Sequence, residues 1–145
     1  MEAFPDGLRM LTGDPLSRSC TGPSKGITWL CLDYSKPYRD ETPDMRYTDC
    51  PNGLRAQVFF PSCWDGVNVD SPDHSSHMAY PDRIDSGICP PSHPHRLVSL
   101  FYEAWFSVKD YNDLNAGGRF VLANGDITGA YVQNSIATTL LSHFT

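Results

Sequence analysis

The stretch RLVSLFYEAWFSV, residues Arg96–Val108, decides the fold that we expect for this chain. Its side chains fall into two alternating sets, which an extended strand would place on opposite faces. One set is Leu97, Ser99, Phe101, Glu103 and Trp105, and the other is Val98, Leu100, Tyr102 and Phe106. Both sets are largely apolar, which is typical of a strand buried inside a sheet sandwich. We therefore predict one long interior strand here.

Other stretches have a similar strand character. Residues Ile27–Tyr34 (ITWLCLDY) are rich in β-branched and aromatic side chains, and residues Leu54–Phe60 (LRAQVFF) alternate before they become wholly apolar. Arg119–Ala123 is a further predicted strand, followed by an Asn-Gly-Asp turn. Apolar residues at helical spacing predict a short C-terminal helix: Ile136, Leu140, Leu141 and Phe144. The predicted fold is mainly β, a β-sandwich or jelly-roll-like arrangement with long irregular loops.

Composition limits the classes of protein and partner. The 145 residues are enough for a single domain with one moderate core, and 12 prolines and 11 glycines favour a loop-rich chain. The net charge is −6, with three lysines and eight arginines and no basic stripe, so nucleic acid is not an expected partner. No run approaches the ~18 apolar residues of a membrane span, so no membrane partner is expected either.

The five cysteines predict disulfide bonds. They lie at positions 20, 31, 50, 63 and 89, and none forms the C-x-x-C pair of a structural zinc site. Such spread spacing in a chain rich in proline and glycine favours disulfides and an oxidising compartment. We favour Cys31–Cys50 and Cys63–Cys89 with Cys20 left free, although spacing alone leaves the connectivity open. The first residues, MEAFP, do not have the pattern of a signal peptide.

The segment from Cys63 to Met78 carries a dense polar cluster. Its candidate site residues are Asp65, Asn68, Asp70, Asp73, His74 and His77. Such a set can bind a divalent metal, or place an acid and a base on either side of a bond. The alternative is a loop of Asx turns whose polar groups satisfy their own backbone. The zincin motif H-E-x-x-H is absent, which disfavours a metalloprotease.

Further candidates lie between the cluster and the end of the predicted interior strand. His93 and His95 are two residues apart, the spacing at which an extended segment points side chains to one side, so they are a possible metal pair. Glu103 lies in an apolar strand and needs either a cleft, where it would act as a general acid, or a basic partner such as Arg96 or Arg55. Four aromatic residues suit a sugar-binding cleft, although each taken alone is more typical of a core: Trp64, Tyr80, Tyr102 and Trp105.

The chain also resembles a known family at the level of whole motifs. The shared segments are FPDGLRMLTGDP (4–15), CLDY (31–34), CPNGLRAQVFFPSCWDGVNVDSPDHSSHMAYP (50–81), SHPHRLVSLFYE (92–103) and NGDITG (124–129). They are similar to a large, mostly fungal secreted family known only as a domain of unknown function, numbered nineteen ninety-six, which often carries sugar-binding WSC modules. The resemblance is most specific over Cys50–Glu103. It implies secretion and association with glycans, but no mechanism.

Three differences from that family pattern affect the expectations. Members have an upstream portion with a signal peptide and a further histidine-rich segment, and this chain resembles the part that follows. Members also continue past N-G-D-x-T-G into a glycine-rich ending that the residues from Ala130 onward lack. We therefore expect residues 1–145 to be a single domain that is a fragment or truncated form of a larger one. His95 stands where the family has an aliphatic residue, which weakens the paired-histidine metal site.

Together these observations predict a secreted carbohydrate-active protein with a polysaccharide or cell-wall glycan as partner. A glycan hydrolase or lyase would draw its catalytic residues from Asp65, Asp70, Asp73, His74, His77, His93 and Glu103. Two alternatives stay open: a non-catalytic cell-wall or host-interaction protein, and a metal-binding protein without catalysis. The sequence assigns no cofactor, leaves metal binding unknown and does not decide whether the protein is an enzyme.

Overall fold

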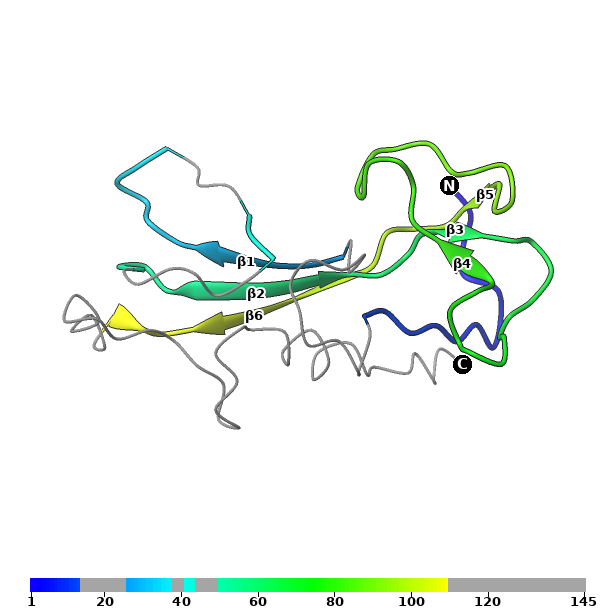
Figure 1. Ribbon diagram of the computed structural model, residues 1–145, viewed down its shortest axis with the longest axis horizontal. Helices are drawn as coiled ribbons and strands as arrows, with labels where there is room; N and C mark the ends of the chain where they lie inside the picture. The colour runs from blue at the N-terminus through cyan, green and yellow to red at the C-terminus, as the bar shows by residue number, and fades with distance from the viewer. Residues whose placement is uncertain (14–25, 38–40, 44–49, 110–145) are drawn as a thin grey trace.

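The computed structural model describes residues 1–13, 26–37, 41–43 and 50–109 of the chain (Figure 1). Within these residues, six strands form two antiparallel sheets. The strands are β1 (Ile27–Cys31), β2 (Leu54–Phe59), β3 (Cys63–Trp64), β4 (Met78–Ala79), β5 (His95–Arg96) and β6 (Phe101–Phe106). The prediction of a mainly β chain with long irregular loops is confirmed. Within the described ranges, no helix is long and apolar enough to cross a membrane.

The larger sheet has the strand order β1-β2-β6. Its register places Trp29 opposite Ala56, and Ala56 opposite Ala104. A backbone bridge between Trp29 and Thr42 extends the sheet beyond β1. Two of the predicted strands, Ile27–Tyr34 and Leu54–Phe60, are confirmed as β1 and β2, which begin at the predicted residues and end slightly earlier.

The smaller sheet, with the order β4-β3-β5, continues the larger one along the longest axis of the molecule (Figure 1). Residues 60–62 lead from β2 directly into β3, so the two sheets share a continuous backbone. The N-terminal segment lies beside the smaller sheet, where Glu2 forms a parallel bridge with Leu97. The short strands of this sheet leave most of residues 65–94 irregular, as expected for a segment with many Pro, Ser and Asp residues.

Alternation along the strands gives the larger sheet an inner and an outer face. The inner side chains of β1 and β2 pack in two hydrophobic clusters. One contains Leu8, Met10, Ile27, Val58, Phe60, Met78 and Leu97, and the other contains Trp29, Cys31, Cys50, Leu54, Ala56 and Val108. The N-terminal residues Leu8 and Met10 thus complete the core beneath the junction of the two sheets. The outer face carries the other set of side chains, several of which are polar or charged.

Both predicted disulfides are present. Cys31 at the end of β1 bonds to Cys50, and Cys63 in β3 bonds to Cys89. Three of the four bonded cysteines are buried in or beside strands, so each bond anchors a loop to the framework. Cys20, the predicted strand Arg119–Ala123 and the predicted C-terminal helix lie outside the described residues.

The prediction of one long interior strand over Arg96–Val108 is wrong. The stretch divides into β5 and β6, and the four residues between them pass from the smaller sheet to the larger one. In this link the Leu97 N–H donates to the Ser62 carbonyl and the Leu100 carbonyl accepts from the Phe60 N–H, so the backbone changes partners. β6 then lies at the end of the strand order, and five of its six residues are exposed. The apolar alternation therefore marks an aromatic edge strand, which periodicity alone does not distinguish from a buried one.

Candidate functional site

The polar cluster predicted from sequence forms one loop, residues 65–77, which we call the acidic loop. It begins with Asp65, whose Oδ1 accepts hydrogen bonds from the backbone N–H groups of Val67 (2.8 Å) and Asn68 (2.9 Å). Asp65 Oδ2 accepts a third bond from the Asn68 side-chain amide at 2.7 Å. Desolvation opposes ionisation of Asp65, but these donors outweigh it and lower its pKa. Asp65 is thus an ionised carboxylate that closes a turn.

Asp70 and His74 form the second contact of the loop. His74 Nδ1 lies 2.6 Å from Asp70 Oδ1, which also accepts from the Ser71 N–H at 2.9 Å. The hydrogen bond from His74 is the main cause of the lowered pKa of Asp70. The His74 backbone has a φ of 53°, a left-handed conformation uncommon outside glycine, and its carbonyl accepts from the Leu11 N–H at 2.8 Å. The pair therefore shapes the loop and joins it to the N-terminal segment.

Asp73 accepts three hydrogen bonds on a single carboxylate oxygen. Its Oδ1 accepts from the N–H groups of Ser76 (2.9 Å) and Ser75 (3.1 Å) and from the Ser71 hydroxyl (2.7 Å). These bonds, with that from Ser76 the largest, hold the pKa of Asp73 far below its usual value. The carboxylate substitutes for the backbone partners that a regular strand or helix would supply.

His77 is the buried centre of the loop, with 2 % of its surface exposed. Its Nε2 lies 2.6 Å from the Arg9 carbonyl, which can only accept, so Nε2 carries a proton. Its Nδ1 lies 2.8 Å from Ser71 Oγ, which also contacts Asp73. Ser71 thus bridges the Asp73 carboxylate and the His77 imidazole.

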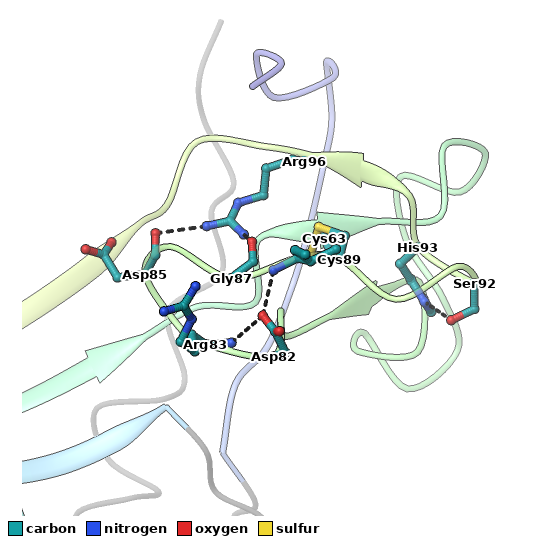
Figure 2. Close-up of a disulfide and its surroundings, with 10 residues drawn as sticks. Cys63, Asp82, Arg83, Asp85, Gly87, Cys89, Ser92, His93 and Arg96 are labelled. Carbon is teal, nitrogen blue, oxygen red and sulfur yellow. Dashed lines mark hydrogen bonds between the residues drawn. A yellow bond between two sulfur atoms is a disulfide. The ribbon is translucent and has the colours of Figure 1, made fainter.

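His93 joins this system from the loop after the Cys63–Cys89 disulfide. Its Nε2 lies 3.1 Å from the Ser76 carbonyl, and its Nδ1 lies 2.9 Å from the Ser92 hydroxyl (Figure 2). His95 instead contacts Glu2, at 3.1 Å, and packs beside the Trp64 ring. The two histidines therefore serve different partners. Across the described ranges, no three His, Cys, Asp or Glu side chains are grouped as metal ligands.

Arg96 and Asp82 hold the disulfide loop rather than a substrate site. The Arg96 guanidinium donates to the carbonyls of Gly87 (2.7 Å) and Asp85 (3.0 Å), and not to an aspartate of the acidic loop (Figure 2). Asp82 Oδ1 accepts from the N–H groups of Ile88 (2.6 Å) and Arg83 (2.8 Å). The bond from Ile88 is the main cause of the lowered pKa of Asp82.

Glu103 lies apart from the other six candidates, on the outer face of β6 in the larger sheet. Its Oε1 lies 3.0 Å from Arg55 Nη1 of the neighbouring strand, so Arg55 is the partner of the two arginines that the sequence suggested. Its Oε2 accepts from the Trp105 indole N–H at 3.3 Å. The structure thus brings Asp65, Asp70, Asp73, His74, His77 and His93 together and places Glu103 in a different sheet.

The four candidate aromatics do not share one surface. The Tyr80 hydroxyl is buried and donates to the Phe59 carbonyl, and burial raises its pKa. The Trp64 indole donates to the Asn68 carbonyl at 2.6 Å, and Tyr102 packs edge-on against the core residue Phe60. Trp105 alone stands on the outer face of the larger sheet, with 59 % of its surface exposed. The sugar-binding cleft formed by all four is therefore not present.

A different aromatic surface surrounds Trp105. We call it the β6 platform and define it by Arg55, Phe59, Phe101, Glu103 and Trp105. Register pairs Phe59 with Phe101 and Arg55 with Trp105, and the first pair stacks with ring centroids 5.0 Å apart. Phe101 is 47 % exposed. The platform thus presents exposed rings at either end of β6, with an ion pair between them.

A chain of polar contacts continues from the platform across the outer face. Arg55 lies 3.8 Å from Glu41, and Glu41 accepts from the Thr28 hydroxyl at 3.0 Å. Thr28 accepts in turn from the buried Gln57 amide at 2.8 Å. These contacts fix the orientation of Arg55 and Glu103, and the mixture of flat rings and fixed polar groups is suited to hydroxyl-rich ligands.

Sequence reasoning missed several residues that organise these regions. Ser71 and Arg9 complete the acidic loop, and Phe101 with Arg55 completes the β6 platform. The position of Ser71 directly after Asp70 was a usable signal, because Asp and Ser in such turns bond neighbouring backbone groups. No local signal identifies Arg9, since its contribution to His77 is a backbone carbonyl.

The fold and its surfaces define a class, a mainly β protein with two disulfides and one polar, aromatic sheet face. Two disulfides indicate an oxidising, extracellular type of compartment. Within that class, a family model matches residues 1–134, and the chain belongs to this family, described as Domain of unknown function (DUF1996). No curated protein and no solved structure matches the chain.

Proposed function

We propose that the protein is a secreted, non-catalytic glycan-binding protein of the cell wall or extracellular matrix, and that the β6 platform is its binding surface. The observation that carries this proposal is the exposure of Trp105 and Phe101 on one sheet face, with the Arg55–Glu103 pair between them. Pyranose rings have apolar faces that stack on aromatic rings, and hydroxyl edges that bond to carboxylate and guanidinium groups.

Catalysis by the acidic loop has less support. Each of its three aspartates has a lowered pKa, so none is protonated near neutral pH to act as a general acid. At least one oxygen of each also accepts hydrogen bonds from nearby backbone N–H groups. His77 is buried with both ring nitrogens engaged. Glu103, which could supply a second carboxyl group, lies in the other sheet.

The direct test is depletion of the purified, disulfide-bonded chain by insoluble cellulose, β-1,3-glucan, chitin and xylan. We expect binding to at least one of these polysaccharides and a loss of about tenfold in affinity for Trp105→Ala. Tyr34→Ala is the matched control, because Tyr34 is an aromatic residue that is 70 % exposed and lies outside the platform. It should bind like the parent chain.

Three outcomes would contradict the proposal. The first is no binding to any of the four polysaccharides. The second is unchanged binding by Trp105→Ala. The third is a dimer that Trp105→Ala dissociates, since a second copy of the chain would then occupy the platform. Release of reducing sugars that is abolished by a double Asp73→Ala, His74→Ala variant with binding retained would instead establish an enzyme.

A further inference from the structure

We infer that the β6 platform takes an extended, electrically neutral oligosaccharide, at least three sugar units long, that lies along β6. This inference rests on the proposed glycan-binding function and specifies its ligand. It follows from the spacing of the exposed rings, from the faces they leave open, and from the charges between them.

The spacing sets the length of the ligand. Phe101 and Trp105 are four residues apart on one strand and therefore share its outer face. At a rise of ~3.3 Å per residue, their Cα atoms are separated by about 13 Å. A single pyranose ring cannot stack on both. A ligand that uses both rings needs one sugar at each end and at least one more between them, above Glu103.

The stacking of Phe59 determines which ring faces are free. Phe59 and Phe101 are nearly parallel, with an interplanar angle of 14°, so Phe59 covers one face of the Phe101 ring. The opposite face of Phe101 is left for a sugar. At the other end, the indole of Trp105 is held by its hydrogen bond to Glu103 and exposes most of its surface. Both aromatic positions are therefore fixed by neighbours before a ligand arrives, which reduces the entropy lost on binding.

The charges exclude acidic sugars. Arg55 is the positive group of the platform, and it already lies 3.0 Å from Glu103 and 3.8 Å from Glu41. The charges of Arg55 and Glu103 cancel within the platform, and the whole chain carries −6. A uronic acid or sulfated sugar would meet the Glu103 carboxylate beside a guanidinium that is already paired with it. Neutral sugars instead donate hydroxyl protons to Glu103 and accept from Arg55.

The test is calorimetric titration with β-1,3- and β-1,4-linked gluco-oligosaccharides and chito-oligosaccharides, from the disaccharide to the hexasaccharide. Oligogalacturonides of equal length provide the acidic comparison. We expect affinity for at least one neutral series to rise about tenfold between the disaccharide and the tetrasaccharide and then to level off. Oligogalacturonides should bind at least about tenfold more weakly.

Variants separate this inference from the proposed function. Phe101→Ala and Trp105→Ala should each abolish the rise in affinity between the disaccharide and the tetrasaccharide. Tyr34→Ala should retain this rise. Equal affinity for the disaccharide and tetrasaccharide, or tight binding of oligogalacturonides, would overturn the inference while leaving glycan binding intact. The absence of binding by every oligosaccharide and polysaccharide would overturn both.

Discussion

The acidic loop and the β6 platform contain the same kinds of side chain but use them differently. In the platform, strand pairing satisfies the backbone, so Arg55, Glu103 and Trp105 interact with one another on the outer face of the sheet. In the acidic loop, strand pairing is nearly absent, and the aspartates accept hydrogen bonds from backbone N–H groups instead. A carboxylate that replaces backbone pairing in this way is needed to hold the fold.

This difference affects how a polar cluster in a sequence is interpreted. A concentration of Asp, Ser and His in an irregular segment is expected when many buried or half-buried N–H groups need acceptors. The same residue types on a regular strand have no such demand and are available to a ligand. Secondary structure therefore decides which of two similar clusters is the better candidate for binding.

The largest expected effect is that of removing the Cys63–Cys89 disulfide bond, which closes the segment that contains the acidic loop. Cys63→Ala combined with Cys89→Ala opens a loop with a sequence separation of 26. We expect the free energy of unfolding to fall by about 3.5 kcal/mol, because the unfolded chain regains the closure entropy. Denaturant unfolding of the oxidised parent and the double variant measures the change.

Hydrogen exchange of the same double variant measures the stability of the acidic loop and of the larger sheet separately. The amide protons of Ser75 and Ser76, bonded to Asp73, should lose protection in the variant. The amide protons of Ala56 and Val58 in β2 should keep a protection that is limited only by global unfolding. Equal loss of protection in both regions would show that the acidic loop and the larger sheet unfold as one unit, which would contradict the separate role of the acidic loop.

The next largest effect concerns His77, the buried centre of the acidic loop. His77→Ala removes the partner of the Arg9 carbonyl and of the Ser71 hydroxyl. We expect a loss of about 2 kcal/mol in unfolding free energy, since a buried acceptor is left without a donor. Thermal and denaturant unfolding report the change, and glycan binding measured at low temperature should persist.

His95→Ala is the matched control for this substitution. The His95 side chain is 43 % exposed and contacts the exposed Glu2, so its loss should change stability by less than about 0.5 kcal/mol. A His77→Ala variant as stable as His95→Ala would mean that the loop does not rely on its buried histidine.

The sequence predicted part of this organisation and missed part for definite reasons. β1 and β2 were predicted because runs of β-branched and aromatic residues and apolar alternation are local signals. Both disulfide pairs are the favoured ones, although cysteine spacing left other connectivities open. The prediction of an interior strand was wrong because the apolar pattern of β6 is the same for a buried strand and for an exposed one. The pairing of Glu103 with Arg55 depends on strand register, and the sequence left Arg96 as an equal choice.

The clustering of the candidate residues could be predicted from the sequence, but their arrangement could not. Six of the seven candidates do meet in one region, because they are close in sequence and the Cys63–Cys89 bond returns His93 to the acidic loop. Their hydrogen-bond partners are backbone groups, and residue types alone do not identify such partners. The two interpretations of the cluster, a reactive site or a network of Asx turns, therefore stayed open until the geometry was known.

A pH titration of stability tests the structural role of two carboxylates, one in the acidic loop and one after β1. Asp73 in the acidic loop and Asp33 after β1 both have pKa values below 3.8, and that of Asp33 is about 2. A lowered folded-state pKa stabilises the protein above the unfolded value, and this contribution is lost as pH falls through the folded value. Stability of the parent chain should therefore decline between about pH 4 and pH 2.

The variants Asp33→Asn and Asp73→Asn show how much of this loss of stability in acid each carboxylate causes. Each should be less stable than the parent at neutral pH and should show a smaller decline in acid, measured by urea unfolding at a series of pH values. Because hydrogen bonds from Ser76 and Ser71 hold the pKa of Asp73 far below its usual value, Asp73→Asn should reduce the decline at the acidic end of the series. An unaltered pH profile for Asp73→Asn would contradict the structural role of this carboxylate.

The smallest expected effect lies in the platform itself. A double-mutant cycle with Arg55→Ala and Glu103→Ala should give a coupling energy below about 1 kcal/mol that falls further in high salt, because water screens partly exposed ion pairs. The Arg55 and Glu103 side chains are 19 % and 28 % exposed, which leaves room for such screening. A coupling above about 2 kcal/mol would mean that the pair stabilises the fold in the way that the carboxylates of the acidic loop do. A small value, combined with weaker glycan binding by Glu103→Ala, would instead show that this carboxylate contributes more to the ligand than to the fold.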